Sequence, residues 1–202
     1  MLKLGFLASH TGSNMQVIID ACQAGTLAAE PRVVISNNSQ SGALARARQA
    51  NIAAYHLSER THGDALGGAI LAAMQRHGVE VICLAGYMKK LGTEVLAAYE
   101  GRILNIHPAL LPKFGGQGMY GMRVHESVLA AGEQESGATV HLVDEEYDHG
   151  RVLAQEKVPV KAKDTPETLQ KRVLAAEHQL YAATLARIAA GEIPIPLPRS
   201  RA

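Results

Sequence analysis

Short apolar runs alternate with segments of helical periodicity through the first half of the chain. The apolar runs predict strands at residues 2–8, 32–36, 53–57, 79–85 and 102–106. Apolar residues that recur every three or four positions predict helices at residues 13–24, 42–50, 64–76 and 93–99. This alternation is typical of parallel strands that right-handed helical crossovers join. The pattern therefore predicts an α/β fold with an open, mostly parallel, twisted sheet and helices on both faces.

Beyond residue 112 the regular alternation stops. A glycine-rich stretch without a period predicts a loop, followed by a helix and by two strands that an acidic loop joins, at residues 113–121, 124–131, 138–143 and 152–158. The last periodic stretch predicts one long helix at residues 165–190, with Asp164 as its N-cap and Pro166 in its first turn. We expect the two late strands to extend the sheet in antiparallel fashion.

Neither an internal repeat nor a linker divides the sequence. With 202 residues the chain is long enough to bury one sizeable core. We therefore expect a single domain over residues 1–202 with a Rossmann-like sheet. The tail at residues 193–202 contains three prolines, which predict an extended segment.

Charge and composition narrow the classes of partner. The 20 basic and 19 acidic side chains nearly balance, which argues against a nucleic-acid or membrane-surface footprint. No apolar stretch approaches the roughly 18 residues that span a bilayer, and the first residues do not resemble a signal peptide. Cys22 and Cys83 lie in apolar segments, as expected in a reducing compartment. We expect a cytoplasmic protein, a monomer or homodimer, whose partners are small molecules.

A polar pair follows the fifth predicted strand, at the sheet edge where open α/β sheets bind ligands. Asn105 and His107 are two positions apart, so in an extended chain both side chains point to the same side. An asparagine amide donates hydrogen bonds without titrating, and a histidine titrates near neutral pH. Pro108 favours an extended residue before it. The alternative is a polar strand end with a surface histidine.

An acidic loop joins the two late strands and ends in Asp148, with Gly150 two residues later. A carboxylate beside an imidazole favours the imidazolium, so Asp148 next to His107 would raise the pKa of that histidine. The alternative is a solvated hairpin, the usual setting of a charge run. If the loop reaches the strand end, the amide, the imidazole and the carboxylate surround one carbonyl carbon. Such a trio favours acyl transfer, specifically formyl transfer, to an amine.

The turn at residues 10–14 joins the first strand to the first helix. Unpaired N–H groups at a helix amino terminus bind phosphate well, and Gly12 would let the backbone come close. Ser13 or Asn14 would add a side-chain donor. The alternative is an ordinary N-cap turn, which uses the same residue types. The turn has neither the lysine of a Walker loop nor the three glycines of a dinucleotide fingerprint.

Glu177 lies on the apolar stripe of the last helix, four positions after Val173 and four before Tyr181. A carboxylate among apolar neighbours is costly unless something pairs with it. The alternatives are a glutamate that reaches solvent from the edge of the stripe, an internal ion pair, or a contact to hydroxyls or an amine of a substrate.

Other catalytic chemistries find little support in the sequence. The histidines that could ligate a metal have no close-spaced partner and no cysteine motif beside them: His107, His125, His141 and His149. No serine stands in a nucleophile elbow, and neither cysteine has an activating neighbour. We therefore expect no metal.

The motif Asn-x-His-Pro-x-Leu-Leu-Pro at residues 105–112, followed by Asp-x-Gly at 148–150, resembles the folate-dependent formyltransferase family over residues 2–191. The resemblance implies a catalytic trio of Asn105, His107 and Asp148. It also implies a phosphate-binding loop and a substrate-side glutamate, which are Gly12, Ser13, Asn14 and Glu177. The folate pocket that it implies involves Met88, Lys89, Lys90, Leu91 and Asn105, together with Asp144 and Glu145 from the loop that wraps the pterin.

The reaction that this resemblance implies uses 10-formyltetrahydrofolate as co-substrate. Members of this length formylate the amine of 5-phosphoribosylglycinamide in de novo purine biosynthesis, whereas members that act on methionyl-tRNA or hydrolyse formyl-folate carry an additional domain. A formyl-folate hydrolase and a non-catalytic folate- or nucleotide-binding module are the alternatives. The chain departs from the family at Ala109, where serine is usual, and in a longer glycine-rich stretch at residues 115–123. A basic folate contact near residues 60–62 is not carried over.

Overall fold

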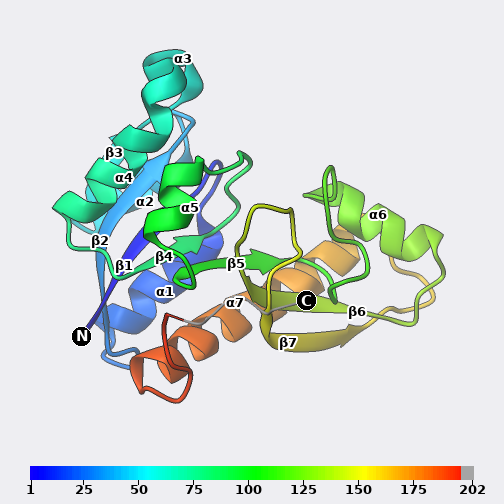
Figure 1. Ribbon diagram of the computed structural model, residues 1–202. Helices are drawn as coiled ribbons and strands as arrows, with labels where there is room; N and C mark the ends of the chain where they lie inside the picture. The colour runs from blue at the N-terminus through cyan, green and yellow to red at the C-terminus, as the bar shows by residue number, and fades with distance from the viewer. Residues whose placement is uncertain (197–202) are drawn as a thin grey trace.

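The computed structural model describes residues 1–196, and a seven-stranded sheet forms its centre (Figure 1). The strand order is β3-β2-β1-β4-β5-β6-β7. The first five strands in this order are parallel, and β6 and β7 each run antiparallel to the strand before them. The strands are β1 (Leu2–Leu7), β2 (Ala29–Ser36), β3 (Ala53–His56), β4 (Val81–Leu84), β5 (Ile103–His107), β6 (Glu135–Leu142) and β7 (Val152–Pro159).

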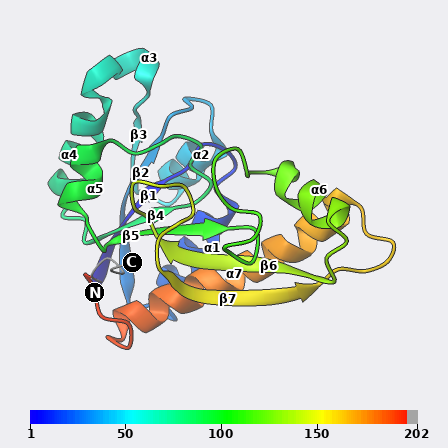
Figure 2. The same cartoon turned by 45° about the vertical axis from the view of Figure 1, so that its right-hand side comes forward.

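Helices cover both faces of this sheet (Figures 1 and 2). One face packs against α1, α2 and α7, and the other against α4 and α5, because alternate strand residues enter opposite cores. The α/β class, the parallel sheet and the late antiparallel strands are thereby confirmed. The helices are α1 (Ser13–Gln23), α2 (Gly42–Gln49), α3 (Glu59–His62), the 3₁₀ helix η1 (Gly63–Ala65), α4 (Leu66–Arg76), α5 (Thr93–Ala98), α6 (Met122–Ala130) and α7 (Pro166–Ala189).

One local prediction was wrong, and one short helix was not predicted. The expected helix at 64–76 forms as η1 followed by α4, and the unpredicted α3 before it begins at a capping box of Ser58 and Thr61. The N-cap of α7 is Thr165, whose hydroxyl accepts the N–H of Thr168. Asp164 instead forms an ion pair with the Arg172 guanidinium at 2.7 Å, so its carboxylate stabilises the helix from outside the cap.

The end of the chain was predicted to be extended over residues 193–202. Residues 197–202 lie outside the described part, and Ile193 is buried against the core. A single domain over the whole chain stays a prediction. Within residues 1–196 no helix combines the length and the apolar character needed to cross a membrane.

The sheet topology decides where a ligand site can form. Strand order reverses between β1 and β4, and the carboxyl ends of β1, β4 and β5 meet at one edge. The antiparallel pairing of β5 with β6 places His141 directly opposite Asn105. Segments that are distant in sequence therefore converge at the end of β5.

Candidate active site

A cavity of about 560 Å³ lies at this edge of the sheet, within the size range of small-molecule sites. Most of the predicted site residues line it: Asn14, Met88, Lys89, Lys90, Leu91, Asn105, His107, Asp144, Glu145, Asp148 and Glu177. Gly12 and Ser13 do not line it. The structure thus brings the strand end, the acidic loop and the last helix to one cavity.

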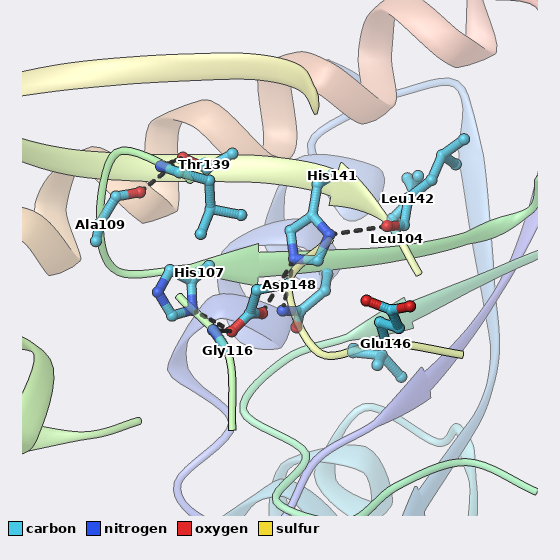
Figure 3. Close-up of polar contacts among 12 residues, drawn as sticks. Leu104, His107, Ala109, Gly116, Thr139, His141, Leu142, Glu146 and Asp148 are labelled. Carbon is cyan, nitrogen blue, oxygen red and sulfur yellow. Dashed lines mark hydrogen bonds and ion pairs between the residues drawn. The ribbon is translucent and has the colours of Figure 1, made fainter. Parts of the chain in front are cut away.

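Asp148 lies between two histidines at the centre of this arrangement (Figure 3). Its Oδ2 is 3.5 Å from Nδ1 of His107, and its Oδ1 is 3.4 Å from Nε2 of His141. The N–H of Gly116 donates to Oδ2 at 3.0 Å. Asn105 lies alongside, with Nδ2 3.0 Å from Nε2 of His141. The amide, the imidazole and the carboxylate therefore do share one cavity wall.

His107 is buried, and both of its ring nitrogens face polar groups. Nε2 donates to the carbonyl oxygen of Phe114 at 2.7 Å, because a carbonyl only accepts. Nδ1 faces the carboxylate of Asp148. Pro108 and β5 hold the backbone extended, as the sequence predicted, but the histidine is a buried group and not a surface one.

The protonation states of this pair correct one expectation. Burial lowers the pKa of His107, and this effect exceeds the opposing influence of Asp148 and the Phe114 carbonyl. Burial alone would raise the pKa of Asp148, but the two histidines and the Gly116 N–H bring it below its usual value. The net direction for the pKa of His107 is thus opposite to the predicted one, although both of its ring nitrogens face acceptors, the Phe114 carbonyl and the Asp148 carboxylate.

The glycine-rich loop at residues 113–121 supplies the backbone partners of both groups. Phe114 and Asp148 each have a φ of 56°, a left-handed conformation that is uncommon for a phenylalanine. Gly115 passes so close to the acidic loop that a Cβ there would lie 3.1 Å from Cβ of Asp148. Strained backbone at this point indicates that the surrounding structure constrains the positions of His107 and Asp148.

His141 is the site residue that the sequence did not single out. It lies in β6, is 2 % exposed, and contacts both Asn105 and Asp148. No local pattern distinguishes it from the other histidines, because its contacts depend on the register of β6 against β5. The one available indication was that His141 lies two positions after Thr139 in a predicted strand, so both side chains would point to the same side.

The turn before α1 has the form expected of an anion-binding helix end. Gly12 is the N-cap with a φ of 71°, and no side chain caps the helix. A Cβ at Gly12 would lie 2.9 Å from Cα of Ala43, so only glycine fits. Neither Ser13 nor Asn14 caps the helix with its side chain, so the structure is compatible with both an ordinary N-cap turn at Gly12 and an anion site at the first N–H groups of α1.

Asn14 and Glu177 form a buried pair beside the cavity. Nδ2 of Asn14 donates to Oε2 of Glu177 at 2.6 Å, while Oδ1 of Asn14 is buried without a partner among the described residues. Burial raises the pKa of Glu177 to about 7, although the Asn14 hydrogen bond opposes this. Within residues 1–196 Glu177 therefore neither reaches solvent nor forms an ion pair, and the amide nitrogen of Asn14 donates to it.

We expect Glu177→Gln to stabilise the ligand-free protein by about 3 kcal/mol above pH 7, because ionising a buried glutamate with a pKa near 7 costs the folded state that much relative to the unfolded chain. The pKa is raised in the folded state, so wild type loses this stability as pH rises from about 4.5 to 7. Urea unfolding at pH 5 and pH 8 measures the difference.

The same measurement on Glu126→Gln, an exposed glutamate of α6, provides the control and should show no comparable change between the two pH values. A Glu177→Gln variant with the same stability difference at pH 5 and pH 8 would show that Glu177 does not titrate in this range.

Two segments face each other at the mouth of the cavity. The ammonium of Lys90 lies 6.0 Å from the ring centroid of Tyr147, which joins the segment at 88–91 to the acidic loop. Lys89 forms an exposed ion pair with Glu59 at 3.5 Å. Oδ1 of Asp144 accepts the N–H of Glu146 at 2.9 Å, so the acidic loop is shaped by its own turn.

Comparison with known proteins agrees with this geometry. A family model described as formyl transferase matches residues 2–185. Phosphoribosylglycinamide formyltransferase of Escherichia coli K12 is 38% identical over 95% of this chain and 89% of its own length. The crystal structure of the enzyme of that name from Brucella melitensis is 44% identical, with a TM-score of 0.86, over 96% of this chain and 98% of that one.

The chain spans about three fifths of the length of some relatives. It is 43% identical to the chloroplastic phosphoribosylglycinamide formyltransferase of Arabidopsis thaliana over 89% of this chain and 62% of that protein. A formyltetrahydrofolate deformylase of Pseudomonas syringae shares the fold with a TM-score of 0.86 at 22% identity. Because the family model covers nearly all of the sheet and both segments that carry the Asn105, His107 and Asp148 cluster, the chain belongs to the formyl transferase family.

Proposed function

We propose that the protein transfers the formyl group of 10-formyltetrahydrofolate to the primary amine of 5-phosphoribosylglycinamide, a step of de novo purine biosynthesis. The observation that carries this proposal is the ionised carboxylate of Asp148 held between His107 and His141, with the Asn105 amide beside it, in a cavity of ligand size. The names of the relatives that match over most of the chain support the choice of substrate.

The proposed ligand positions follow the cavity walls. The formyl-folate lies against residues 88–91 and against Asp144 and Glu145 of the acidic loop, all of which line the cavity. The ribonucleotide lies toward the other side, with its phosphate at the uncapped amino end of α1, on the backbone of Gly12, Ser13 and Asn14. Because the side-chain amide of Asn14 is hydrogen-bonded to Glu177, residue 14 contacts the phosphate through its backbone N–H.

In this arrangement Glu177 accepts hydrogen bonds from the hydroxyls of the substrate ribose. Its carboxyl is buried at the cavity, with one oxygen on the Asn14 amide. A substrate hydroxyl that donates to the other oxygen would stabilise the charged form, so binding would lower the pKa of Glu177 from about 7. The energetic cost of an ionised Glu177 is thereby reduced in the complex.

In the first step the amine nitrogen attacks the formyl carbon, and the carbonyl electrons move onto oxygen. Nδ2–H of Asn105 and Nε2–H of His107 donate to this oxyanion. A neutral imidazole is sufficient for that role, because Nε2 already carries a proton in the ligand-free protein, where the Phe114 carbonyl accepts it. The substrate oxygen takes the place of that carbonyl when the loop at 113–121 moves aside.

The attacking amine must then lose a proton and the folate nitrogen must gain one. Through a water molecule, Asp148 accepts the amine proton, and the neighbouring Nδ1 of His107 shares it. The proton passes to the departing folate nitrogen as the bond from carbon to that nitrogen breaks and the formyl C=O re-forms. The products are formylated substrate and tetrahydrofolate, with no net proton held by the protein.

The test is a formyl-transfer assay on the purified chain with 10-formyltetrahydrofolate, with and without 5-phosphoribosylglycinamide. We expect one formylated product for each folate consumed, and negligible formate release when the amine is omitted. Formate release at the same rate without the amine would indicate a hydrolase. Binding of both ligands without turnover would indicate a non-catalytic module. The cytoplasmic location and the monomeric or dimeric state stay predictions.

A further inference from the structure

The two ring nitrogens of His141 have defined and different partners. Nδ1 lies 2.8 Å from the carbonyl oxygen of Leu142, and a carbonyl only accepts, so Nδ1 carries the proton. Nε2 lies 3.0 Å from Nδ2 of Asn105, and an amide nitrogen only donates. In these two contacts Nδ1 is therefore the donor, and Nε2 is the acceptor that offers its lone pair to Asn105.

The surroundings keep this ring in one place. His141 is 2 % exposed and lies directly opposite Asn105 in the antiparallel pairing of β5 and β6. The Leu142 carbonyl that holds Nδ1 is packed against the backbone of Gly150, where any Cβ would collide with that oxygen. The acceptor presented to Asn105 is thus fixed by the sheet and by the end of the acidic loop.

An asparagine amide has a donor end and an acceptor end, and a half-turn about its last bond exchanges them. Stabilising an oxyanion requires the donor end. Nε2 of His141 accepts one hydrogen of Nδ2, and both residues line the cavity. The second hydrogen of Nδ2 has no acceptor among the described residues, so it can donate to a substrate oxygen.

We propose that His141 is a positioning residue that holds the Asn105 amide with its nitrogen toward the reacting carbonyl. This inference rests on the proposed formyl transfer and on the oxyanion role of Asn105. His141 touches neither substrate in this proposal. It acts through the orientation of Asn105, to which Nε2 presents its lone pair.

A competing role for His141 is proton storage beside Asp148, since Nε2 also lies 3.4 Å from Oδ1 of that carboxylate. That role requires a proton on Nε2, and a protonated Nε2 does not accept from Asn105. The contact to Asn105 is shorter by 0.4 Å (3.0 against 3.4 Å), which favours the acceptor role. The two roles predict opposite results for a side chain that accepts but does not titrate.

Two amide substitutions separate them. The terminal amide of a glutamine reaches about as far as Nε2 of histidine, so His141→Gln keeps an acceptor for Asn105 without a titrating group. The shorter His141→Asn reaches only about as far as Nδ1, so it keeps the Leu142 contact and leaves Asn105 unpaired. Both variants are polar and of similar volume, and thermal unfolding of each, with binding of 10-formyltetrahydrofolate, verifies that the fold and the pocket are retained.

We expect His141→Asn to lower kcat about 10- to 100-fold with little change in KM, which is below the roughly 100- to 1,000-fold expected for complete loss of an oxyanion donor. We expect His141→Gln to stay within about tenfold of wild type. A Gln variant as impaired as the Asn variant would overturn the proposal and favour proton storage.

A double-mutant cycle gives a second, independent measurement. If His141 acts through Asn105, then His141→Asn added to Asn105→Ala causes little further loss, whereas His141→Asn added to His107→Ala multiplies the two losses. If the loss of kcat caused by His141→Asn instead multiplies with the loss caused by Asn105→Ala, the proposal is overturned. A wild-type protein that shows no formyl transfer at all would instead contradict the proposed function, which keeps the two failures distinct.

Discussion

Replacing Asp148 with asparagine is expected to lower kcat for formyl transfer by about 100- to 10,000-fold, the range seen when a proton-transferring group is removed or its charge is lost. The carboxylate is the only negative group that lies within 4 Å of both His107 and His141 in the described chain. Without it, the proton leaving the amine has no anionic acceptor, and an imidazolium at His107 has no counter-charge.

The variant should fold normally, which makes the result interpretable. Asparagine tolerates the left-handed φ of 56° at this position, and its carbonyl oxygen can still accept the Gly116 N–H. The measurement is kcat and KM over a range of pH values. The control is Asp64→Asn, the same substitution at an exposed aspartate in η1. A variant within tenfold of wild-type kcat would remove Asp148 from the proton pathway.

Replacing Asn105 with alanine is expected to lower kcat by about 100- to 1,000-fold while KM changes little. The amide donates to a charge that exists only after the amine has attacked, so its loss affects the transition state and leaves substrate binding nearly intact. The substitution also leaves Nε2 of His141 without its donor, but the ring keeps its Leu142 contact.

Single-turnover rates and separate binding measurements for both substrates test this prediction. Gln134→Ala removes an exposed amide far from the cavity and serves as the control. An Asn105→Ala variant that keeps its kcat but shows a greatly raised KM would mean that the amide binds the ground state, which would contradict the oxyanion role.

Local patterns in the sequence were sufficient for several parts of the site. The spacing of two between Asn105 and His107 placed both at the cavity, because side-chain direction in a strand repeats every two residues. The helical stripe likewise placed Glu177 on the apolar side of the last helix, but only the structure showed that its carboxyl is buried. The turn at Gly12 was recognisable because a close backbone approach and a positive φ require glycine.

Other parts depend on partners that local patterns do not identify. The backbone acceptor for His107 comes from Phe114, in a loop whose shape the sequence left open. The pKa of His107 was predicted to rise because Asp148 was the only neighbour that the sequence suggested, and burial reverses the sign. The N-cap of α7 was placed one residue early because Asp164 and Thr165 are both good N-cap residues, and the ion pair that Arg172 forms with Asp164 is visible only in the structure.

The sequence by itself determined the alternation of strands and helices, the side on which Asn105 and His107 point, and the family motif, since all of these are set by neighbours within one or two turns of chain. The tertiary structure alone decided that His141 lies opposite Asn105 and that Asp148 sits between two imidazoles. Strand register, loop closure and burial bring Asn105 and His107 to residues more than 30 positions away, and the energies of these contacts depend on packing that no short segment specifies.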